Sequence, residues 1–94
     1  MDFVEKFNEL VSTLPSHRRF KELEEMTGIK GRTWINISSG KQKANHEHIE
    51  ALGKAFPQYA YWLVTGETDE GNGHTSPVLE RIQNDLRKAG RDAA

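Results

Sequence analysis

The segment from residue 20 to residue 41 constrains the fold more than any other part of this chain, because it has the pattern of two short helices around a glycine. The apolar residues of the first helix recur at every third position, as expected for one stripe of a helix; they are Phe20, Leu23 and Met26. Gly28 follows that stripe and favours the left-handed turn that ends many helices. Trp34 and Ile37, three positions apart, then predict the inward face of a second helix.

The polar residues of the second predicted helix are of the types that hydrogen-bond to nucleic acids. They lie off the apolar stripe and are Arg32, Thr33, Asn36 and Ser39. Residues 16–43 hold seven basic and three acidic residues, a net +4, whereas residues 1–15 carry −2 and residues 44–94 carry −3. A DNA-binding face needs only a local positive field, so the overall charge of −1 does not oppose one. Taken alone, such a segment favours ordinary solvated surface.

The composition excludes several kinds of chemistry. The chain has no cysteine, which rules out disulfides, thiolate zinc sites and cysteine nucleophiles and fits a reducing cytoplasm. Its longest apolar run, residues 60–64, is far too short to span a membrane. His46 and His48 fall on different faces of a helix with no third metal ligand at a suitable spacing, so we expect them to be solvated or to contact phosphate. Because no catalytic constellation stands out, we expect a cytoplasmic protein that is not an enzyme and has no cofactor, metal site, membrane contact or small-molecule substrate.

Helices are also predicted on both sides of the central segment. An apolar stripe runs through residues 2–14 and should end before Pro15, because the residue before a proline avoids helical angles. Ser16 is then a candidate N-cap for the helix that follows, or a turn residue, and Asn45 is a candidate N-cap for a fourth helix. The inward residues of that fourth helix are Ile49, Leu52 and Phe56. The aromatic residues 59–64 predict a short fifth helix that helps to close the core.

The last part of the chain differs from the rest. Residues 67–75 contain two glycines and no apolar residue, which predicts a flexible connection. Ser76 as N-cap and Pro77 at the first position predict a final helix that Gly90 ends, with residues 91–94 frayed. One face of this helix forms an apolar seam, made of Leu79, Ile82, Leu86 and Ala89. A helix this short is unstable alone in water, so it must pack on its own domain or on a partner.

Two motifs in this order resemble a known family. The first has the spacing of the helix-turn-helix of lambda-repressor-like (XRE/Cro) regulators; its residues are Gly28, Ile29, Trp34, Ile37, Gly40 and Lys41. The second is YWLVTG, residues 61–66, which resembles the short fifth-helix ending common in that family. The resemblance covers roughly residues 3–66. It implies an all-α fold, with a five-helix DNA-binding domain over residues 1–66 and an appended connection and helix over residues 67–94.

The resemblance also implies a set of contacts, because family members place the amino-terminal end of the second motif helix in the major groove. The base-reading residues carried over by position are Arg32, Thr33 and Asn36. The residues carried over as phosphate contacts are Arg18, Arg19, Lys30, Ser39, Lys41 and Lys43. Two positions depart from the pattern. Gly31 stands where the family often has a polar reader, and Ile35 is a large apolar residue that would touch a thymine methyl, pack on a neighbouring helix or face a partner subunit.

The function implied by the resemblance is sequence-specific regulation of transcription, by a repressor of phage or prophage type that binds double-stranded DNA as a homodimer on a palindromic operator. We expect the seam residues Leu79, Ile82 and Leu86 to hold the dimer, and the aromatic residues 59–64 are the other candidate surface. The alternative function is a protein-interaction module, an antitoxin or an adaptor, built on the same helices.

Overall fold

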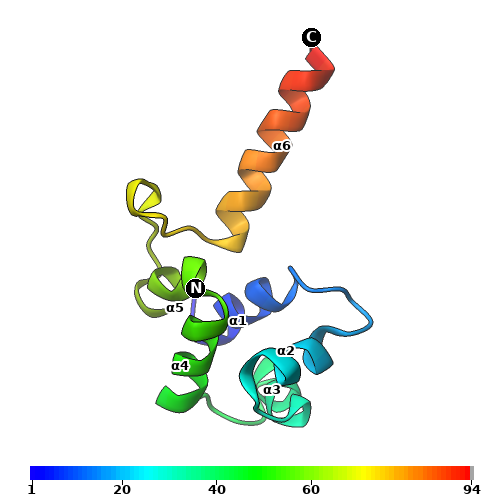
Figure 1. Cartoon of the computed structure of the whole chain (residues 1–94), viewed down its shortest axis with the longest axis vertical. Coiled ribbons are helices and arrows are strands. Elements are labelled where there is room, and N and C mark those ends of the chain that lie inside the picture. The colour runs from blue at the N-terminus through cyan, green and yellow to red at the C-terminus, as the bar shows by residue number, and fades with distance from the viewer. Residues whose placement is uncertain (94) are drawn as a thin grey trace.

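Helices make up most of the described part of the chain. The computed structural model describes the backbone of residues 1–93 and the side chains of residues 1–90, and within them an isolated bridge is the only β-type pairing. In chain order the elements are α1 (Phe3–Val11), α2 (Arg19–Thr27), α3 (Gly31–Ser38), α4 (His46–Ala55), η1 (Pro57–Tyr59), α5 (Ala60–Thr65), η2 (Glu70–Asn72) and α6 (Pro77–Ala93). Helices α1 to α5 form one body, and α6 extends away from it (Figure 1). The predicted all-α class is therefore confirmed.

The first helix is shorter than predicted. Asp2 is its N-cap, and the Asp2 carboxylate accepts a hydrogen bond from the Glu5 backbone N–H at 2.8 Å. It ends at Val11 rather than at residue 14. The hydroxyls of Ser12 and Thr13 donate to the backbone carbonyls of residues 9 and 10, and this local bonding competes with a continued helix. Ser16 is a turn residue, the second of its two expected roles, and the N-cap position of α2 belongs to Arg18, which makes no side-chain cap bond.

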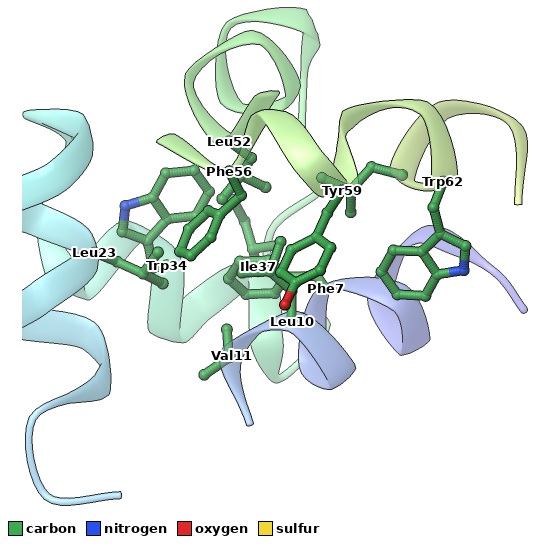
Figure 2. Packing of buried hydrophobic residues seen from close by; sticks show 11 residues of the cluster. Phe7, Leu10, Val11, Leu23, Trp34, Ile37, Leu52, Phe56, Tyr59 and Trp62 are labelled. Atoms are coloured by element: carbon green, nitrogen blue, oxygen red, sulfur yellow. The ribbon is translucent and has the colours of Figure 1, made fainter. Parts of the chain in front are cut away.

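Side chains from all five body helices meet in one core (Figure 2). Its buried members are Phe7, Leu10, Val11, Leu23, Trp34, Ile37, Leu52, Phe56, Tyr59, Trp62 and Leu63. The rings of Phe7 and Trp34 stack with centroids 5.5 Å apart, which joins α1 to α3. Trp34 and Ile37 are both 0% exposed, as their spacing predicted. Met26, predicted to face inward, is 45% exposed, because a spacing of three falls about 60° short of a full helical turn at each step, so the third residue of the stripe leaves the face of Phe20 and Leu23.

The start of α4 combines a correct prediction with a wrong one. Asn45 is the N-cap, and its side chain accepts from the backbone N–H groups of Glu47 and His48. His48 was expected to be solvated or to contact phosphate, but it is only 7% exposed. Its Nδ1 accepts the Asn45 backbone N–H at 3.0 Å, which completes a reciprocal capping box, and its ring lies edge-on to Trp34. His48 is therefore a structural residue.

The aromatic segment closes the core from the other side. Tyr59, Trp62 and Leu63 are each at most 5% exposed, and Gly66 ends α5 with a φ of 77°. The Lys6 ammonium, on a buried side chain, donates to the Leu63 carbonyl at 2.8 Å and so ties α5 to α1. Three of the six residues 59–64 are therefore buried in the core, whereas Val64 is 69% exposed.

Residues 67–75, predicted to be a flexible connection, form a hydrogen-bonded turn. The backbones of Asp69 and His74 exchange two hydrogen bonds around η2. The His74 ring also lies against that of Tyr61, with centroids 5.1 Å apart. The Thr75 N–H donates to the Gln58 carbonyl at 2.9 Å, which fixes the point from which α6 departs.

The final helix starts as predicted but ends later. The Ser76 hydroxyl accepts the Leu79 N–H at 3.0 Å, and Pro77 occupies the first helical position. The helix continues through Gly90 to Ala93, so Gly90 does not end it, and residue 94 of the segment expected to fray lies outside the described residues. Tyr59 donates to Glu80 at 2.7 Å, and Arg81 pairs with Glu9, so the base of α6 is anchored to the body.

The outward course of α6 makes the molecule elongated, with principal extents of 47 × 29 × 21 Å. Among the described residues, no helix is both long and apolar enough to cross a membrane.

Candidate nucleic-acid interface

A single hydroxyl organises the turn between α2 and α3. Thr27 Oγ1 donates to the Leu23 carbonyl at 2.5 Å and accepts the Ile29 backbone N–H at 3.2 Å. It also accepts Nε1–H of the buried Trp34 at 3.1 Å. Gly28, with a φ of 75°, supplies the left-handed residue that lets the chain reverse here. The turn residue was predicted from the sequence, whereas the role of Thr27 was not.

The start of α3 lies tightly against α2. A Cβ added to Gly31 would approach the Phe20 carbonyl oxygen to 3.0 Å, closer than side chains normally come to a backbone oxygen. The Gly31 N–H donates to a Glu24 carboxylate oxygen at 2.8 Å, which places a negative charge at the positive end of α3. Gly31 therefore permits the close contact between α2 and α3.

One face of α3 is directed outward. Arg32, Ile35, Asn36 and Ser39 share this outer face at a spacing of 3, 4 and 7 positions. Arg32 and Ser39 are exposed, Ile35 is 47% exposed and Asn36 is half-buried. Thr33 is half-buried at the margin of the same face. The exposure of Ile35 removes one of its three expected roles, that of packing on a neighbouring helix.

The loop after α3 is folded back onto the helix end. Gly40 has a φ of 79°, and the Asn36 carbonyl accepts the backbone N–H groups of Lys41 and Gln42 at 2.9 and 3.2 Å. Ser39 was predicted to contact phosphate, and its hydroxyl donates to the same Asn36 carbonyl at 3.3 Å. Lys41 and Lys43 are both exposed beyond this turn.

The basic residues expected to contact phosphate fall into two groups. Lys30, before α3, is exposed like Lys41 and Lys43 after it, and no ion pair within the described side chains involves any of the three. Arg18 instead pairs with Glu25 at 3.6 Å, and both side chains are about half exposed. Arg19 is half-buried, and its Nε donates to the Leu14 carbonyl at 3.1 Å, which braces the turn before α2. The lysines are therefore better placed to meet a phosphate than the two arginines are.

A metal centre has no support among residues whose side chains are described, because no group of three potential ligands comes together there. His46 is exposed, whereas His48 is held in the α4 cap, so the two histidines do not converge.

Comparison with known proteins adds no assignment: neither a protein family nor a curated protein matches this chain. The candidate interface therefore depends on the geometry of α2, α3 and the loop after α3. Within it the sequence indicated the exposed polar residues of α3 and the flanking lysines. It did not indicate Thr27 or Glu24, which position α3 through contacts across seven residues of sequence.

Proposed function

We propose that this protein is a sequence-specific DNA-binding regulator of transcription, with a lambda-repressor-like helix-turn-helix in a five-helix domain. The observation that carries the proposal is the division of α3 into two faces. Trp34 and Ile37 are fully buried on one side, while the outer face bears a guanidinium, an amide and a hydroxyl. A helix anchored by one face is suited to enter the major groove with the other.

The chemistry of the outer face supports direct readout of bases. The Arg32 guanidinium suits the O6 and N7 acceptors of guanine, and the Asn36 amide suits N6 and N7 of adenine. Ile35, which is 47% exposed, suits a thymine methyl. The three exposed lysines at the two ends of α3 supply positive charge for the phosphates on either side of the groove. A dimer bound across a palindromic operator would repress transcription by excluding polymerase from promoter DNA.

The test of base reading is selection of bound sites from a random DNA library, followed by binding measurements on variants of the selected site. Arg32→Ala and Asn36→Ala should each weaken binding to the selected site by ~1–3 kcal/mol and flatten the discrimination at one base position. Loss of affinity that is equal for all site variants would contradict base reading by the substituted residue. Failure to select any sequence with the unmodified protein would contradict the proposed function as a whole.

Phosphate contacts are separated from base reading by salt dependence. Lys43→Ala should weaken binding to all sequences alike and reduce the slope of log affinity against log salt by about one unit. Lys54→Ala is the matched control, because Lys54 lies on α4 and pairs with Glu50 at 3.2 Å. An equal change in slope for both variants would indicate a general charge effect rather than a contact at residue 43.

The second candidate, a protein-interaction module, is favoured by the internal bonds of Arg18 and Arg19. Retention on random duplex DNA distinguishes the two functions. A DNA-binding protein elutes at raised salt, whereas an adaptor passes through at low salt.

A further inference from the structure

The outer half of α6 exposes apolar side chains that its own domain does not cover. Leu79 is half-buried at the base of the helix, but Ile82 and Leu86, on the same face, are 51% and 68% exposed. Residues 84–90 are all exposed, and the helix stands clear of the body along this length (Figure 1). A helix of 17 residues is marginal in water without a partner for its apolar face.

An apolar groove continues from this face onto the body. It has a volume of about 560 Å³ and runs between α6 and the end of α5. Its apolar lining includes Met1, Trp62, Val78, Leu79 and Ile82. Because Leu79 and Ile82 belong both to the seam and to the groove, the two form one continuous surface. Met1, at the rim of this surface, is 68% exposed.

The charges along α6 are distributed unevenly. Residues 77–85 carry Glu80, Arg81 and Asp85, a net −1, whereas residues 86–90 carry two basic residues, Arg87 and Lys88, and no acidic one, a net +2. Two such helices that run in opposite directions place the acidic half of each beside the basic half of the other. Parallel helices would place the two basic halves together, which is unfavourable.

We propose that the partner of this surface is a second copy of the same chain, bound through antiparallel pairing of the two α6 helices about a two-fold axis. Complete overlap of two helices that each run from Pro77 to Ala93 puts residue 85 near the axis. Ile82 of each copy then lies within one position of Ala89 of the other, which places a large side chain beside a small one. The carboxyl-terminal half of each α6 covers the groove beside the amino-terminal half of the other copy's α6. The same surface of both copies is therefore buried, as a two-fold interface requires.

Sedimentation of the free protein at micromolar concentration tests the pairing without DNA, so its outcome does not depend on the proposed function. The unmodified protein should sediment as a dimer, and Leu86→Asp should halve the apparent mass while circular dichroism shows an intact helical fold. Asn84→Asp is the control, because it adds the same charge about half a turn away from Leu86 and should leave the dimer intact. A monomeric unmodified protein, or a Leu86→Asp variant that remains a dimer, would overturn the proposal. If the partner were a different protein, the unmodified protein would sediment as a monomer.

The direction of pairing can be read from disulfide formation, because the chain contains no cysteine of its own. Ile82→Cys and Ala89→Cys proteins are mixed and allowed to exchange subunits before oxidation. Antiparallel pairing predicts that the disulfide between the two different variants dominates. Dominance of disulfides within each variant would show parallel helices and overturn the proposed arrangement.

Discussion

The indole of Trp34 shows how one buried polar atom determines the residue beside it. Its ring is fully buried, so its N–H needs a hydrogen-bond acceptor inside the protein. Thr27 provides that acceptor and at the same time bonds to the backbone on both sides of Gly28. One hydroxyl thus couples the core to the geometry of the turn that positions α3.

Replacement of this hydroxyl by a methyl group should therefore be costly. Thr27→Val keeps the shape of the side chain but leaves the Trp34 N–H buried without an acceptor, so the free energy of unfolding should fall by ~1–3 kcal/mol. Thr27→Ser keeps the hydroxyl and should lose no more than about 1 kcal/mol. Chemical denaturation followed by tryptophan fluorescence measures both variants. Equal losses would show that the hydroxyl does not bond to the indole in solution.

At the scale of elements, the crossing of α2 and α3 depends on a position without a side chain. The amino-terminal end of α3 lies so close to the Phe20 carbonyl that a methyl group at Gly31 would press against backbone rather than against a flexible side chain. Gly53 is different, since a methyl group there would meet only the Ala60 Cβ, at an ordinary 3.5 Å. The two glycines lie in helices of similar length but in unlike surroundings.

Alanine substitution should have opposite effects at these two glycines. Gly31→Ala should lower the free energy of unfolding by ~1–3 kcal/mol, because α3 must shift away from α2. Gly53→Ala should raise it by ~0.5–1 kcal/mol, because alanine loses less backbone entropy in a helix. Thermal or denaturant unfolding of the two variants gives the comparison. A stabilising Gly31→Ala would mean that the two helices are not in close contact there.

At the scale of the whole molecule, the base of α6 is attached to the body through polar contacts. The Tyr59 hydroxyl donates to Glu80 across 21 positions of sequence, and Arg81 pairs with Glu9 across 72. Burial, together with the hydrogen bond to Glu80 and its negative charge, raises the pKa of Tyr59 to about 12. The protonated phenol is thus part of what holds α6 in place.

This raised pKa predicts a loss of stability in alkaline solution. The folded protein keeps the phenol proton until the pH reaches about 12, whereas the unfolded chain releases it near 10, so the contribution is complete below pH 10 and is lost between these values. Tyr59→Phe removes this contribution, and its free energy of unfolding should fall less steeply with pH over the same interval. Denaturant unfolding across an alkaline pH series measures the difference. Parallel curves for the two proteins would contradict the raised pKa.

The sequence alone determined the features that depend on residues a few positions apart. The spacing of Trp34 and Ile37 predicted their burial, and the cap residues Asn45 and Ser76 marked the starts of two helices, because capping bonds form within three residues. Gly28 predicted the turn before α3 for a similar local reason. The polar residues on the outer side of α3, which make up most of the candidate interface, follow from the same helical periodicity.

Contacts between residues far apart along the chain follow from the packing of the helices and not from the sequence pattern. Arg19 was predicted to contact phosphate, but the turn before α2 places the Leu14 carbonyl where it accepts a hydrogen bond from Arg19 Nε. His48 was predicted to be solvated or to contact phosphate, but it packs against the Trp34 ring. No pattern in the sequence indicated that α6 extends away from the body (Figure 1). The physical reason is the same in each case: burial and hydrogen-bond partners are set by the packing of separate helices, whereas periodicity describes each helix by itself.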